Sequence, residues 1–187
     1  MKTQIFESFK VTDVVFLAVI SAVTLCTSAV MPLVVSLQPV VFGIANLVTS
    51  LQISFFFTVG LVKVRKTGAL FIMSLFMGLF QLLMAPIMFF STLSVSLVVE
   101  LLILIMFRGY KKNCAVFTAM VLYNPLGLVS NVLYNLLFGR ETALAVLTRA
   151  PVVTVCMTVA VAALSVTGAL LGIKISGELE KSGVLKK

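Results

Sequence analysis

Four long stretches of this chain contain no Asp, Glu, Lys or Arg: residues 14–62, 67–99, 113–139 and 150–173. A helix needs about 20 apolar residues to cross the hydrocarbon core of a bilayer, which is roughly 30 Å thick. The first stretch has 49 residues and accommodates two such helices. A mean hydropathy of +1.22 is too high for a soluble domain of this length. The charge-free stretches therefore predict an all-α integral membrane protein.

Prolines mark where the longest stretches turn. Proline lacks the amide proton that a helix interior requires, and it disfavours a helical conformation of the preceding residue. Pro32 and Pro39 therefore place one turn near residues 32–39, and Pro86 places another next to Ala85. The sequence predicts a single membrane domain over residues 1–187, a compact bundle of six helices at about 12–31, 40–62, 67–84, 87–107, 113–138 and 150–173.

Basic residues orient the bundle, because Lys and Arg in short loops are retained on the cytoplasmic side. With the N-terminus inside, the inner segments hold 12 Lys and Arg residues, whereas the outer segments hold only Arg140 and Arg149. Both termini are therefore expected in the cytoplasm. The net charge of +8 reflects this asymmetry, so it predicts contact with anionic membrane lipid and no nucleic-acid partner.

Several kinds of catalytic and metal site are excluded. The chain has no histidine, which removes the commonest general base and the usual zinc ligand. It has no Gly-rich loop followed by Lys that would hold the phosphates of ATP. Cys26, Cys114 and Cys156 show neither metal-ligand nor redox spacing. We therefore expect no catalytic residue, no metal and no cofactor, and we interpret the chain as a protein that is not an enzyme.

A polar stripe runs along the fifth predicted helix. Offsets of 0, 3, 7, 10 and 11 form one helical face, which here holds Asn124, Gly127, Asn131, Tyr134 and Asn135. An unpaired amide in hydrocarbon costs several kcal/mol, so this face must meet water, a ligand or neighbouring helices. For Asn124, ligand contact and helix packing are equally consistent with the sequence. Asn131, Tyr134 and Asn135 lie in the outer half of the bundle, and this position favours ligand contact for them.

Two further polar residues are candidate ligand contacts. Gln81, near the end of the third predicted helix, offers an amide in the outer half of the bundle. Arg140 lies in the outer loop after the fifth helix, where it would pair with an anionic ligand group or remain a solvated loop residue.

The first predicted helix carries Ala18 and Ala22, four residues apart on one face. Small residues at this spacing let another membrane helix approach closely. That second helix belongs either to the same bundle or to a partner protein.

A six-helix membrane protein of 187 residues with both termini inside, an Ala18-x-x-x-Ala22 face and no ATP-binding motif resembles the substrate-specific S component of an energy-coupling factor (ECF) transporter. Within that family it is most similar to the streptococcal and treponemal branch. The resemblance implies a subunit that captures a vitamin or other micronutrient at the outer face of a bacterial plasma membrane. It also implies a membrane coupling subunit that docks on Ala18 and Ala22, and two ATP-binding subunits. In that family the outer loops close over the ligand, which favours Arg140 as a ligand contact.

Two alternatives stay open. A stand-alone small transporter or channel would use Glu100, the carboxylate within the fourth predicted helix, as its coupling or selectivity group. Otherwise Glu100 is expected to reach toward Arg108, Lys111 or Lys112 at the membrane interface. The second alternative is a membrane scaffold that transports nothing.

Overall fold

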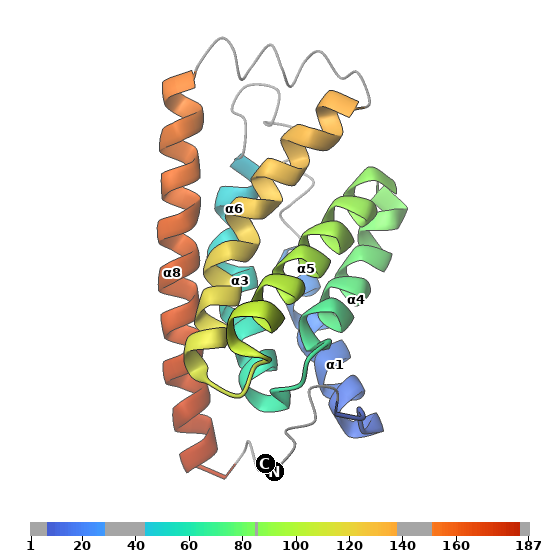
Figure 1. Ribbon diagram of the computed structural model, residues 1–187, viewed down its shortest axis with the longest axis vertical. Coiled ribbons are helices and arrows are strands. Elements are labelled where there is room, and N and C mark those ends of the chain that lie inside the picture. Colours follow the sequence, from blue (N-terminus) through green and yellow to red (C-terminus); the bar gives the residue numbers. More distant parts are fainter. Residues whose placement is uncertain (1–6, 29–43, 85, 138–150, 184–187) are drawn as a thin grey trace.

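The computed structural model describes residues 7–28, 44–84, 86–137 and 151–183. Within these ranges every regular element is a helix and none is a strand. The helices are α1 (Val11–Thr27), α3 (Ile44–Val64), α4 (Ala69–Met84), α5 (Pro86–Phe107), α6 (Asn113–Leu137) and α8 (Pro151–Lys181). They form one elongated bundle, and α1 begins at the same end of it at which α8 finishes (Figure 1).

Four of the described helices are long and apolar enough to cross a membrane: Asn46–Val64, Pro86–Phe107, Asn113–Tyr134 and Val155–Lys181. The other two, α1 and α4, are also apolar but shorter, with 17 and 16 residues. Large apolar side chains such as Val11, Leu101 and Val155 face outward, which suits a surface covered by lipid. The described part of the chain is thus a multi-pass, all-α membrane protein.

Prolines begin two of the helices. Pro86 is the first residue of α5 and Pro151 is the first residue of α8. Proline suits this position because its missing N–H would have no helical partner there and its φ is already set. The predicted turn at Ala85 and Pro86 falls between α4 and α5. The predicted turn at residues 32–39 lies outside the described residues.

Each of the six predicted segments overlaps one helix of the structure, and the largest difference is at the end of the last one. We placed that end at residue 173, but α8 continues to Lys181. Hydropathy identifies only the apolar segment that fits the hydrocarbon core of the bilayer. The helix itself is able to continue beyond that core, through the interface and into water. Lys174, Glu178 and Lys181 therefore belong to α8.

Helices α3 and α8 pack closely against each other, and two glycines of α8 allow this approach. A Cβ atom at Gly168 would lie 2.5 Å from the Leu51 carbonyl oxygen, and one at Gly172 would lie 2.7 Å from the Thr58 Cβ atom. Ser165 extends the same small-residue face and is fully buried. Helices inside a bilayer use such small-residue faces for close packing, because lipid provides no hydrophobic drive between them.

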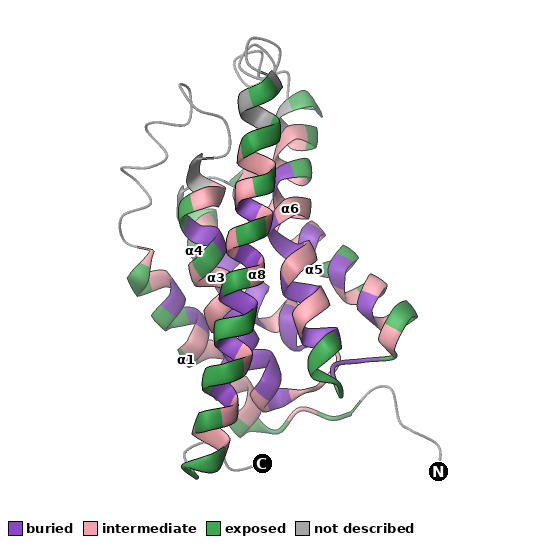
Figure 2. Cartoon of the chain, turned by 90° about the vertical axis from the view of Figure 1, so that its left-hand side faces the viewer, coloured by how far each residue is buried: buried purple, intermediate pink, exposed green. Residues whose placement is uncertain are grey.

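The apolar core lies in the half of the bundle that contains the α3–α4 and α5–α6 turns. Its largest enclosed side chains come from five helices and include Leu17, Phe57, Leu61, Met73, Ile103 and Met120. Figure 2 shows buried positions on the inner sides of the helices and a line of exposed positions along α8. The opposite half of the bundle contains the hydroxyl pairs that Ser130 and Tyr134 of α6 form with Ser91 and Ser94 of α5.

The close contact between α3 and α8 predicts that Gly172→Ala destabilises the protein. The added methyl group meets the Thr58 side chain and the Phe55 carbonyl oxygen, which lies 2.9 Å from its position. Overpacking of this kind costs about 1–3 kcal/mol. Thermal unfolding in detergent micelles measures the loss.

Gly177→Ala, on the same helix, is the matched control, because a Cβ atom at Gly177 has no neighbour within 4 Å. It should stabilise α8 slightly, since Ala exceeds Gly in helix propensity by up to about 1 kcal/mol. Equal unfolding temperatures for the two variants would contradict the packing described here.

Candidate functional site

Asn124 joins three helices near the middle of the bundle. Its side chain is 6% exposed. From α6, its Nδ2 atom donates to the Ser50 carbonyl oxygen at 3.1 Å and to the Ser54 hydroxyl at 2.9 Å, both on α3. A third acceptor, the Ser165 hydroxyl on α8, lies at 2.8 Å. Two amide hydrogens thus share three oxygens, and contacts within the bundle account for the donor capacity of Asn124.

The side chain of a second asparagine packs one turn farther along α6. A Cβ atom at Gly127 would lie 3.6 Å from the Asn46 Nδ2 atom, so the amide of Asn46 on α3 packs against the backbone of α6 at this position. Asn46 and Asn124 therefore follow each other along the α3–α6 contact. We call Asn46, Ser50, Ser54, Asn124 and Ser165 the amide layer.

Hydroxyl pairs connect α6 to the α4–α5 hairpin. The Tyr134 and Ser94 hydroxyls are 2.8 Å apart, and the Ser130 and Ser91 hydroxyls are 3.0 Å apart. Both pairs join α6 to α5. Each pair satisfies polar groups that would otherwise meet hydrocarbon, which holds the second half of α6 against α5.

The structure places the predicted ligand contacts at several different junctions. Asn131 and Tyr134 are half-buried on α6, and each already makes polar contacts. Gln81 lies at the α4–α5 junction, where its Oε1 atom accepts a hydrogen bond of 2.6 Å from the Thr92 hydroxyl. Arg140 and the side chain of Asn135 lie outside the described residues.

Sequence reasoning missed Gln52, which ties α3 to α1. Its Nε2 atom donates to the Thr24 carbonyl oxygen at 2.8 Å and to the Ser28 hydroxyl at 3.0 Å, and it also contacts the Thr27 hydroxyl. The available signal was an amide within a long uncharged stretch. Ser50 and Ser54, four residues apart on the same helix, were a comparable signal for the amide layer.

The alanines of α1 face away from the described bundle. Ala22 is exposed and Ala18 is half-buried. The opposite face of α1 holds Leu17, Ser21 and Thr24, which are fully buried against the neighbouring helices. Helix α1 therefore uses its serine and threonine side for packing within the described bundle and leaves the alanine side uncovered there.

Glu100 interacts with the first turn of α4. Its Oε1 atom accepts a hydrogen bond of 2.8 Å from the Gly68 backbone N–H, and the backbone N–H groups of Leu70 and Phe71 also lie close to this carboxylate. The start of a helix has unpaired N–H groups and a partial positive charge, so a carboxylate is stabilised there. We expected Glu100 to reach basic side chains, but the ion pairs among the described residues do not include it.

Comparison with known protein families, curated proteins and solved structures found no match to this chain.

The position of Glu100 predicts a graded effect of substitution on stability. Glu100→Ala removes the acceptor that faces the start of α4, so it should lower the free energy of unfolding by about 0.5–2 kcal/mol, as other lost helix caps do. Glu100→Gln keeps a side-chain oxygen and should cost less. Chemical denaturation in detergent gives both values, and a Gln variant as unstable as the Ala variant would contradict a capping role.

Proposed function

We propose that this chain is the substrate-binding membrane subunit, the S component, of an ECF-type ATP-driven importer in a bacterial plasma membrane. The proposal includes six membrane spans and cytoplasmic termini. It assigns the chain the capture of a vitamin or other micronutrient at the outer face, and delivery through a coupling subunit with two ATP-binding subunits. The chain itself performs no catalysis in this scheme.

The positions of the basic turns support the proposed orientation. The α3–α4 turn carries Arg65 and Lys66, and the α5–α6 turn carries Arg108, Lys111 and Lys112. Both turns lie at the end of the bundle where α1 begins and α8 finishes (Figure 1). Basic residues favour the cytoplasmic side, so this end is assigned to the cytoplasm.

The lengths of α1 and α4 are compatible with six spans. At a rise of 1.5 Å per residue, helices of 17 and 16 residues are about 24–26 Å long. That is a few ångströms short of an average hydrocarbon core, a mismatch that local thinning of the bilayer accommodates at modest cost. We therefore count α1 and α4 as spans beside the four longer helices.

The uncovered alanine face of α1 carries the proposal. Ala22 is exposed, and so are Val19 and Val23 beside it. A strip of short side chains without charge gives a partner helix close backbone approach within the membrane. The described bundle does not use this strip, so the proposal assigns it to the coupling subunit.

The polar side chains of α6 support a ligand site in the opposite half of the bundle. Asn131 and Tyr134 offer an amide and a phenol, which donate and accept hydrogen bonds without net charge, whereas the donor capacity of Asn124 is used within the bundle. Such groups suit a neutral polar ligand. An anionic ligand would require Arg140, which the proposal retains together with Asn135 and Gln81 as further ligand contacts.

A stand-alone transporter or channel coupled through Glu100 is less favoured. The carboxylate is hydrogen-bonded to the first turn of α4, so moving it during a transport cycle would leave backbone N–H groups unpaired.

The proposal is tested by Ala22→Phe. A bulky ring on the docking face should reduce co-purification of the coexpressed coupling subunit and ATP-binding subunits by about tenfold or more, because each 1.4 kcal/mol of lost contact is a factor of ten. The helical fold should persist, since Ala22 is exposed. Quantitative blotting of the affinity-purified complex measures the loss.

Leu101→Phe is the control, because Leu101 is an exposed residue of α5 that is remote from the alanine face. It should leave the complex intact. Unchanged recovery of the coupling subunit with Ala22→Phe would contradict docking on α1.

A further inference from the structure

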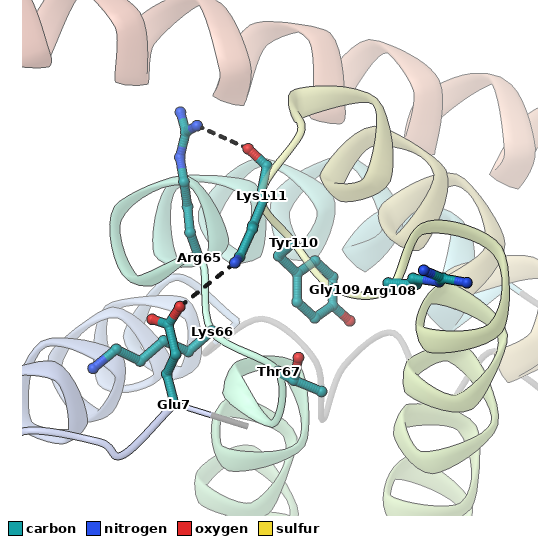
Figure 3. Close-up of a pocket in the computed structure, with 8 residues that line it drawn as sticks. All are labelled: Glu7, Arg65, Lys66, Thr67, Arg108, Gly109, Tyr110 and Lys111. Carbon is teal, nitrogen blue, oxygen red and sulfur yellow. Dashed lines mark hydrogen bonds and ion pairs between the residues drawn. The ribbon is translucent and has the colours of Figure 1, made fainter. Parts of the chain in front are cut away.

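The basic turns enclose a small pocket at the end of the bundle. Figure 3 shows its lining, which consists of Glu7, Arg65, Lys66, Thr67, Arg108, Gly109, Tyr110 and Lys111. Four of these side chains are cationic and one is a carboxylate. The recess has room for about one water molecule or one oxygen of a larger group.

Several contacts hold the cationic side chains in place. The Arg65 Nε atom donates to the Val62 carbonyl oxygen at 2.9 Å, and its Nη1 atom donates to the Lys111 carbonyl oxygen at 3.2 Å (Figure 3). The Lys66 Nζ atom is 2.7 Å from an Asp13 carboxylate oxygen. Lys111 is exposed, and its Nζ atom pairs with Glu7 at 3.8 Å. Arg65 is therefore oriented before any ligand arrives, whereas Lys111 is able to change partner.

Tyr110 lies between the two turns with an unpaired hydroxyl group. The residue is 1% exposed, and its hydroxyl oxygen is buried without a hydrogen-bond partner among the described residues. Arg65 and Lys111 lie on one side of Tyr110, and Arg108 lies on the other (Figure 3). Burial, and to a lesser extent the charge of Glu100, raises the pKa of the Tyr110 hydroxyl far above its usual value. The hydroxyl thus stays protonated and is available as a donor.

We infer that this pocket binds the phosphate group of an acidic phospholipid, with one phosphate oxygen in the recess and Arg65, Arg108 and Lys111 around the charge. A phosphate oxygen would reach the orphaned Tyr110 hydroxyl, which is closed to solvent in this structure, through a local shift of the two turns. Guanidinium groups match phosphate geometry. The pocket lies where membrane helices end, which is the depth of lipid headgroups. This inference rests on membrane insertion and does not depend on the proposed transport function.

The test compares two variants of equal charge. Arg108→Gln changes a residue of the pocket, whereas Lys112→Gln removes one positive charge from a neighbouring exposed side chain outside the lining. The full chain is reconstituted in nanodiscs of phosphatidylcholine with increasing phosphatidylglycerol of the same acyl chains. Native mass spectrometry then counts retained phosphatidylglycerol, and thermal unfolding reports the stabilisation that it confers.

We expect the unchanged chain and Lys112→Gln to retain phosphatidylglycerol selectively, and Arg108→Gln to retain about tenfold less, as loss of a charge-assisted contact implies. Tyr110→Phe should raise the unfolding temperature in pure phosphatidylcholine, because it removes an unpaired buried hydroxyl. The same variant should gain less from phosphatidylglycerol than the unchanged chain does.

Three results would overturn the inference. Equal losses in Arg108→Gln and Lys112→Gln would show diffuse charge attraction without a site. Absence of any preference for phosphatidylglycerol over phosphatidylcholine would exclude an acidic lipid. Equal stabilisation by inorganic phosphate or glycerol 3-phosphate in detergent would assign the pocket to a soluble phosphate and remove the lipid from it.

Discussion

The contact between α3 and α8 at Gly168 and Gly172 is the constraint on which the described bundle depends. Because these glycines have no side chains, the two backbones approach so closely that added Cβ atoms would overlap the Leu51 carbonyl group and the Thr58 side chain. The same approach brings the Ser165 hydroxyl near Ser54, so that one amide, Asn124, reaches both. In a medium without water, this shared hydrogen bonding fixes the position of α6.

The two halves of the bundle consequently differ in chemistry. Enclosed apolar side chains such as Phe57, Met73 and Met120 fill the half nearest the basic turns. The other half contains Asn46 and the polar residues of the second part of α6, of which Ser130 and Tyr134 pair with hydroxyl groups of α5. A ligand entering there would exchange hydrogen bonds with these groups. The asymmetry agrees with the ligand capture that we propose for one end of the bundle.

Local sequence rules predicted the helices better than they predicted the contacts between them. The all-helical class and the break at Pro86 follow from charge-free length and from the missing N–H of proline, both of which are visible in the chain. Gly168 and Gly172 show the expected spacing of a close-packing face, but spacing does not identify α3 as the partner. Hydropathy also underestimated α8, because charged residues after 173 continue the helix beyond the hydrocarbon.

Candidate site residues were the hardest to assign, because a polar side chain in a membrane helix has several ways to be satisfied. The stripe on α6 correctly indicated a face that meets polar partners, yet Asn124 bonds to serines on two other helices whose positions no local pattern gives. Glu100 is a similar case. Its hydrogen-bond partner is the backbone N–H group of Gly68, which lies just before α4 and 32 positions earlier in the chain. The sequence does not distinguish this backbone group from others.

We propose that the ligand contacts the polar face of α6, and direct detection of that ligand tests the proposal. The most direct measurement purifies the full chain in mild detergent from cells grown in rich medium, and identifies retained molecules by native mass spectrometry followed by denaturing extraction. We expect one stoichiometric compound that is lost in Asn131→Ala and kept in Asn113→Ala, which alters an exposed amide at the other end of the same helix. A chain that retains no compound, and binds none from a panel of micronutrients, would rule out the proposed ligand site.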